Sequence, residues 1–139
     1  MPLFDSVVYP VCSPQLLKEF KGKITPADLV NLPLLSVETE FDYWNKWFVS
    51  ANVEAGIITP HMVVDTKAVA LEMAINNEGI ALVNGPFVDN DLESGQLVKP
   101  CQHETVFSGS WGIICRKENK DREDIQSLVN WLLTITADM

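Results

Sequence analysis

The sequence predicts an α/β domain built on a parallel β-sheet. Short apolar segments rich in β-branched residues alternate along the chain with segments of helical spacing. The clearest case is residues 61–85, HMVVDTKAVALEMAINNEGIALVNG, which we interpret as strand, helix and strand. A helix joining two strands in this way implies a parallel pair with a right-handed crossover. Ligands of such sheets bind beyond the carboxyl ends of the strands, against helix N-termini. The residues at those positions are Asp65, Thr66, Asn84 and Gly85.

The helix of this central unit has clear start and end signals. Asp65 supplies an N-cap oxygen, and aliphatic residues then follow at helical spacing. Several alanines among them let the helix lie close to a sheet. We expect the helix to run from Thr66 to Asn77 and to end at Gly79, because glycine readily adopts the left-handed conformation.

Three elements are predicted at the start of the chain. The segment Asp5–Cys12 is extended, with Pro10 expected at an edge or a crossing point because proline has no N–H to donate. Ser13 followed by proline predicts a helix, which Gly22 ends. Thr25, again followed by proline, predicts a second, short helix.

An aromatic helix follows a strand that we predict at residues 34–37. Asp42 is expected to cap this helix, and its aromatic residues Trp44, Trp47 and Phe48 fall on one face. Aromatic residues at this spacing favour a buried core stripe over a ligand wall.

The rest of the chain predicts an acidic turn or helix at Phe87–Ser94, a strand at Val106–Cys115 and a final helix at Arg122–Thr136. The alternating acids of the first segment lack the glycine and distal glutamate of a calcium loop, so no metal site is predicted. Asp121 can cap the final helix. Its apolar stripe must dock on another surface and consists of Ile125, Leu128, Val129 and Leu132.

Composition excludes several classes of function. The chain has 139 residues and a formal net charge of -9, which argues against direct binding to nucleic acid or to an anionic membrane. Lys18, Lys21 and Lys23 are expected to form a solvated face. No apolar run approaches the roughly 20 residues that span a bilayer, and no secretory signal is visible. The 3 cysteines favour reduced thiols in a cytosolic protein over a redox or nucleophilic role, which would need a nearby base.

No catalytic constellation is visible in the sequence. No serine stands in a nucleophile elbow with a paired histidine and acid, and there is no P-loop or GxGxxG. The carboxylates Glu38, Glu40 and Asp42 are more simply a hydrated loop face than an acid–base pair. We therefore predict no enzyme activity and no cofactor.

Blocks of residues that follow one another at family-like spacing carry a resemblance to a known family. They are YPVCSPQLL, TPADLVNLPLLS, YWNKWF and VVDTKAVALEMAINNEGIALVNGPFVDNDLESGQLVKP. Together they resemble the effector-binding domain of LysR-type transcriptional regulators, in the subgroup of glycine-cleavage activators and β-lactamase regulators. The resemblance covers nearly the whole chain, from Leu3 to the final helix.

The resemblance implies a periplasmic-binding-protein-like (type II) fold, in which two lobes hold a small-molecule effector between them. It implies that residues 9–105 are the complete second lobe and residues 1–8 a hinge or crossing strand. Residues 106–139 would then supply the return strand and C-terminal helix of a first lobe that is otherwise missing. The family's winged helix-turn-helix, through which DNA would be bound, is also missing from this sequence.

The resemblance also implies an effector site. The family uses the start of the helix after the third strand of the second lobe, which is Thr66 here; the alternative is that Thr66 only starts a helix. Asn84 follows the next strand at the same sheet edge, although it is equally suited to a turn before a glycine. Ser36 and Glu38 end another parallel strand and are candidates for the rim. Trp111 corresponds to an aromatic position near the lobe crossing, where packing at a hinge is the alternative to stacking on an effector.

These observations predict a cytoplasmic regulator that senses a small molecule to control transcription. The apolar stripe of the final helix predicts that a neighbouring copy covers it, giving a homo-oligomer, most simply a dimer. The alternatives are a lobe of a solute-binding protein, against which the missing signal sequence argues, and a small α/β enzyme. The effector is left open between an amino acid, a peptidoglycan fragment and an aromatic acid.

Overall fold

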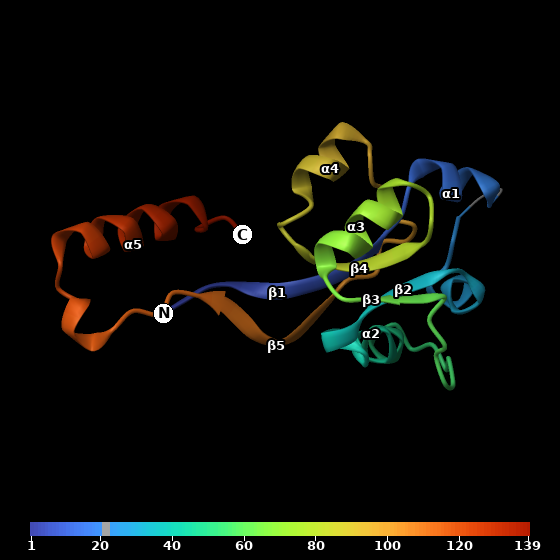
Figure 1. Ribbon diagram of the computed structural model, residues 1–139, viewed down its shortest axis with the longest axis horizontal. Coiled ribbons are helices and arrows are strands. Elements are labelled where there is room, and N and C mark those ends of the chain that lie inside the picture. Colours follow the sequence, from blue (N-terminus) through green and yellow to red (C-terminus); the bar gives the residue numbers. More distant parts are fainter. Residues whose placement is uncertain (21–22) are drawn as a thin grey trace. The chain divides into compact units, whose positions relative to one another are not determined.

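The computed structural model describes residues 1–20 and 23–139, so the predictions for Lys21 and Gly22 lie outside the described residues. Strands and helices alternate as predicted (Figure 1). The strands are β1 (Pro2–Val11), β2 (Leu34–Val37), β3 (Met62–Val64), β4 (Ile80–Gly85) and β5 (Thr105–Gly112). The helices are α1 (Pro14–Glu19), α2 (Tyr43–Ser50), α3 (Lys67–Ile75), α4 (Asp89–Ser94) and α5 (Glu123–Ile135). Short 3₁₀ helices are η1 (Pro26–Asn31), η2 (Glu38–Glu40) and η3 (Lys117–Asn119).

The chain divides into two compact units. The sheet unit spans Val7–Thr105, and the terminal unit combines Met1–Ser6 with Val106–Met139. The assignment of residues 9–105 and 106–139 to two different lobes of an effector domain stays a prediction.

The sheet is mixed, which corrects the expectation of a parallel layer. Its strand order is β3-β2-β4-β1-β5, with β2 parallel to β3 and to β4 but β1 antiparallel to β4. The strands on either side of α3 are therefore parallel but not neighbours, because β2 lies between them. All four residues of β2 are buried, whereas Met62 and Val63 of β3 are exposed. This difference in burial suits β2 to the interior of the sheet and β3 to its edge.

Pro10 lies within β1, at a position that does not require a backbone donor. It pairs with Leu82 of β4 and is fully buried. Two residues later, Cys12 exchanges hydrogen bonds of 3.0 and 2.8 Å with Val98, on the side of the chain away from β4. Alternate residues of a strand direct their N–H groups to the same side, so the missing N–H of Pro10 also faces away from β4.

Helix α3 begins one residue later than the sequence suggested. The N-cap is Thr66, whose hydroxyl accepts a hydrogen bond from Val69 N at 3.3 Å, and not Asp65. Ala70 and Ala74 are buried on the inner face of the helix, as expected of small residues that let a helix lie close to a sheet.

The turn after α3 uses its residues differently from the prediction. Asn77, with φ of 63°, adopts the left-handed conformation, and its Oδ1 accepts a hydrogen bond from Ser13 Oγ at 2.6 Å. Gly79 is needed for space instead. A Cβ there would lie 2.8 Å from the side chain of Leu35 and 2.8 Å from Pro33 O. The glycine is therefore required by close packing against β2 and not by a positive φ.

Helices cover both faces of the sheet in this unit (Figure 1). On one face, α3 and the segment around α4 pack on Leu35, Val37, Val64 and Val83. On the other, α2 buries Trp44, Trp47 and Phe48, which confirms the predicted aromatic stripe.

Contacts of α2 fix its orientation on the sheet. Trp44 Nε1 donates to Leu35 O at 2.8 Å, which ties the helix to β2. Asp42 occupies the N-cap position but makes no side-chain capping bond, contrary to the prediction; its carboxylate pairs with Lys46 at 3.0 Å. Trp47 Nε1 is buried without a hydrogen-bond partner in the part of the chain that the structure describes.

In the terminal unit, Met1 and Ile113 exchange hydrogen bonds, and α5 follows after η3. Contrary to the prediction, Asp121 does not cap α5. The N-cap position is Arg122, which pairs with Asp124 at 2.6 Å. The helix buries none of its own residues, and Leu128 is 50% exposed. Among the described residues, no helix is long and apolar enough to cross a membrane.

Candidate functional site

The carboxyl ends of three parallel strands meet at one edge of the sheet unit. Val37 of β2 pairs with Val64 of β3, and the register of β2 with β4 continues from Leu35 opposite Ala81. The next residues along the three strands are Glu38 after β2, Asp65 after β3 and Asn84 after Val83 of β4. Thr66 directly follows Asp65. Because β2 lies between β3 and β4, the ends of the outer two strands are roughly 10 Å apart, a width that suits a small molecule.

Thr66 lies at this edge, as the N-cap residue of α3. Its Oγ1 accepts from Val69 N, so the hydroxyl caps the helix and its own hydrogen stays available to donate. The side chain is exposed. It can therefore start the helix and contact a ligand at the same time.

The other predicted rim residues differ in exposure. Asn84 is half-buried in the last part of β4, and Glu38 is exposed at the start of η2. Ser36 is only 6% exposed and pairs with Val63 inside the sheet. The register therefore places Thr66, Asn84 and Glu38 at the same edge of the sheet, whereas Ser36 lies inside β2, two residues before Glu38.

Trp111 lies in β5 of the terminal unit. Its ring stacks on that of Phe4, with centroids 6.4 Å apart and 28° between the planes, and the residue is 43% exposed.

Sequence reasoning missed a polar network at the same sheet edge. Lys67, next to Thr66, directs its ammonium at Glu40 Oε2, 2.5 Å away, and at Leu82 O, 2.8 Å away. The ammonium also lies 5.7 Å from the centroid of the Tyr43 ring. Burial raises the pKa of Tyr43, and the negative charge of Glu40 raises it further. The only hint in the sequence was the presence of charged residues just after two predicted strands.

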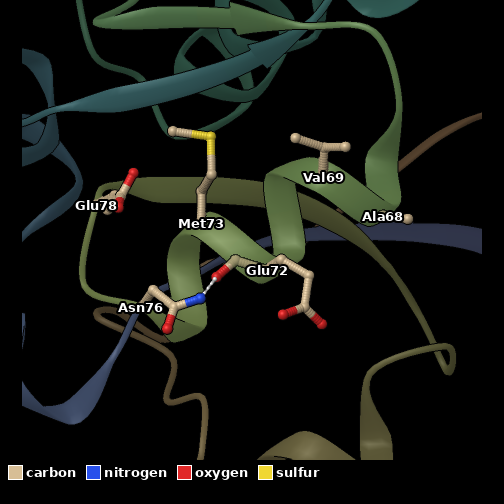
Figure 2. A pocket seen from close by; sticks show the side chains of 6 residues that line it. All are labelled: Ala68, Val69, Glu72, Met73, Asn76 and Glu78. Atoms are coloured by element: carbon tan, nitrogen blue, oxygen red, sulfur yellow. Dashed lines mark hydrogen bonds between the residues drawn. The ribbon is translucent and has the colours of Figure 1, made fainter.

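A separate shallow groove runs along α3 (Figure 2). Its volume is about 270 Å³, and its lining extends from Ala68 to Glu78 without including Thr66 or Asn84. Val69 and Met73 supply apolar surface, and the amide of Asn76 donates to Glu72 O at 2.8 Å.

One serine and one histidine of the sheet unit lie close together. Ser50 Oγ is 2.8 Å from His103 Nε2, but the hydroxyl also lies 2.6 Å from Trp47 O, to which it donates. The serine proton is therefore directed at a backbone carbonyl and not at the imidazole, as a nucleophile would need. Residues 1–20 and 23–139 contain no group of three histidine, cysteine or acidic residues that could hold a metal ion.

The buried thiols are also poorly suited to nucleophilic chemistry. Burial raises the pKa of Cys12 to about 11, and the nearby Cys101 adds to this effect. Burial also raises the pKa of Cys101. Since the thiolate is the reactive form, both thiols are held in the unreactive one at neutral pH.

Comparison with known proteins identifies the family. The family model described as the LysR substrate binding domain matches residues 1–136. The chain belongs to the LysR substrate-binding domain family. This match confirms the resemblance to the effector-binding domain of LysR-type regulators.

Curated relatives of this LysR domain are regulators of transcription. An uncharacterized helix-turn-helix-type regulator of Sinorhizobium fredii is 35% identical over 135 residues, which are 95% of this chain and 44% of the relative. The glycine cleavage system transcriptional activator of Escherichia coli is 29% identical over 140 residues, 97% of this chain and 44% of the relative. The chain thus spans less than half the length of these relatives.

Solved structures confirm the fold. The effector domain of the regulator AmpR from Pseudomonas aeruginosa has a TM-score of 0.83 at 25% identity, covering 99% of this chain and 65% of that one. The AmpR effector-binding domain of Citrobacter freundii also has a TM-score of 0.83, at 24% identity, covering 100% of this chain and 68% of that one. The LysR domain described here therefore has the periplasmic-binding-protein-like (type II) fold of these effector domains.

Proposed function

We propose that this LysR domain senses a small molecule at the sheet edge formed by Thr66, Asn84 and Glu38. The observation that carries the proposal is the register of the strands. Two parallel strands bring Thr66 and Asn84 to the same edge, with the end of β2 between them. A hydroxyl, an amide and the backbone N–H groups at the start of α3 can together hold a polar ligand group.

The ligand acts by biasing a conformational equilibrium. A small molecule that binds one arrangement of the regulator more tightly shifts the population toward it by its difference in affinity. In a full regulator, this shift changes how a separate winged helix-turn-helix meets its operator. We propose no enzyme activity and no cofactor for the domain, and we place the regulator in the cytoplasm.

Direct DNA contact by this chain is not part of the proposal. Its net charge of -9 opposes the attraction to phosphates that dominates DNA affinity. Operator binding by this chain at moderate salt would therefore contradict the proposed division of roles.

We also propose that the regulator is a homo-oligomer, most simply a dimer. In α5, Leu128 is 50% and Trp131 57% exposed, and a neighbouring copy would remove such apolar surface from water. Sedimentation of this chain should show an associated species. A monomer at all concentrations would refute this part of the proposal.

A ligand screen tests the sensing function. We would screen amino acids, peptidoglycan fragments and aromatic acids by thermal shift and repeat each hit with Thr66→Val and Asn84→Ala. Both variants should lose the shift, because each removes a polar partner at the edge. Thr59→Val is the matched control, since Thr59 is also exposed but precedes β3 at its amino end. A hit that binds both edge variants as tightly as the unmodified protein would refute the site.

A further inference from the structure

The ammonium of Lys67 is held at the sheet edge by two oxygens from different elements. Glu40 contributes a carboxylate oxygen from η2, at 2.5 Å, and Leu82 contributes its backbone carbonyl from β4, at 2.8 Å. The two oxygens differ in how firmly they are placed. The carbonyl belongs to a strand whose residues 80–83 are buried, whereas Glu40 lies in a single turn without a side-chain cap.

The ion pair between Lys67 and Glu40 is partly exposed to solvent. The side chain of Lys67 is 26% exposed and that of Glu40 22% exposed. A solute can therefore reach the ammonium if the carboxylate moves. The carbonyl of Leu82 would keep the ammonium in place during that exchange, because it is fixed by the sheet.

We propose that Glu40 is an internal ligand of Lys67, and that the effector carries a carboxylate group that displaces it. This inference rests on the proposed function, since it places one group of the effector beside Thr66. The chemistry of the exchange is balanced because one carboxylate replaces another on the same ammonium. Release of Glu40 frees η2 from α3, so carboxylate binding is coupled to the position of that segment.

A second ion pair nearby offers a matched comparison. Lys46 pairs with Asp42 at 3.0 Å, and its ammonium also lies over the Tyr43 ring, 5.8 Å from the centroid. Both of its side chains are more exposed, at 54% and 42%, and both come from the start of the same helix. This pair joins no separate elements, so its loss should not affect the sheet edge.

The test is a carboxylate titration followed by NMR. Sodium acetate, succinate and benzoate would be added to the full chain at constant ionic strength set with sodium chloride. Amide ¹H–¹⁵N shifts of residues 65–68 and 82–85 report binding. Glu40→Gln should lower the apparent Kd of at least one carboxylate by about tenfold, because the competing charged hydrogen bond is weakened. Lys67→Met should abolish the saturable shifts, and Lys67→Arg should retain them.

The outcomes separate this inference from the proposed function. If Glu40→Gln and the unmodified chain bind these carboxylates with equal affinity, the inference is overturned. Saturable carboxylate binding to Lys67→Met would also overturn it. If Asp42→Asn gains as much carboxylate affinity as Glu40→Gln, the inference is also overturned, because the gain would then come from the loss of any negative charge nearby. If a screened effector depends on Thr66 and Asn84 but binds Glu40→Gln and Lys67→Met normally, the sensing function stands and the internal ligand is refuted. Should Lys67→Met fail to fold, the near-isosteric Glu40→Gln decides alone.

Discussion

Replacing Gly79 with alanine tests whether this glycine is required by space or by backbone conformation. Alanine normally stabilises a compatible glycine position by about 0.4–1 kcal/mol, through the unfolded state. Here the added Cβ would lie 2.8 Å from the side chain of Leu35 and 2.8 Å from Pro33 O. Leu35 is 2% exposed, so it has little room to move. Pro33 O also accepts the hydrogen bond from Ile80 N at 2.9 Å, so its displacement would disturb the start of β4.

We expect Gly79→Ala to lower the free energy of unfolding by about 1–3 kcal/mol, the usual cost of overpacking. Urea unfolding followed by circular dichroism measures the change. Gly95→Ala is the control for backbone strain, because Gly95 has φ of 80° and no atom within 4 Å of its Cβ position.

A double-mutant cycle with Leu35→Ala separates the two explanations. Shortening Leu35 should relieve part of the clash, so the two substitutions together should cost less than the sum of their separate costs. Strictly additive costs, or a Gly79→Ala protein as stable as the unmodified chain, would refute the packing argument.

Three further predictions concern caps and titration. Thr66→Ala should cost about 1 kcal/mol in urea unfolding and Asp65→Ala much less, because only the threonine caps α3. Asp121→Ala should stay within about 0.5 kcal/mol of the unmodified chain in the same assay, since it caps nothing. Burial raises the pKa of Tyr9 from 10.0 to about 12 and so favours its neutral form in the folded state. The resulting stabilisation should be present below pH 10 and lost as the pH rises from 10 to 12, and Tyr9→Phe should remove this loss in urea titrations.

The fold class was predictable because it depends on local patterns. Alternating apolar segments, serine or threonine before proline, and the aromatic spacing of Trp44, Trp47 and Phe48 all report local structure, and the structure agrees with them. The order of the strands was not predictable in the same way. The insertion of β2 between β3 and β4, and the antiparallel β1, depend on pairing between distant segments.

The errors at helix ends have a common physical origin. Asp65 and Thr66 are neighbouring residues with side-chain oxygens, and only the backbone path decides which of them caps α3. Asn77 and Gly79 both tolerate the left-handed conformation, so composition alone could not choose between them. Asp121 failed as a cap because the helix starts after Arg122.

The candidate site was only partly accessible from sequence. The positions of Thr66 and Asn84 at one edge follow from the general rule for parallel strands, and the register bears out that geometry. The contact between Lys67 and Glu40 joins residues 27 positions apart, and no local pattern indicates which of the nearby acids would approach the lysine. The burial of Ser36 was likewise invisible, because it depends on the helix that covers that face.

The placement of the 4 tryptophans gives this chain two intrinsic fluorescent reporters. Trp44 and Trp47 are 3% and 0% exposed in the sheet unit, whereas Trp111 and Trp131 are 43% and 57% exposed in the terminal unit. Indoles shielded from water emit at shorter wavelengths than hydrated ones, so the buried pair supplies the blue side of the emission spectrum. A red shift on warming would therefore record the melting of the sheet unit, with no dye and no added label.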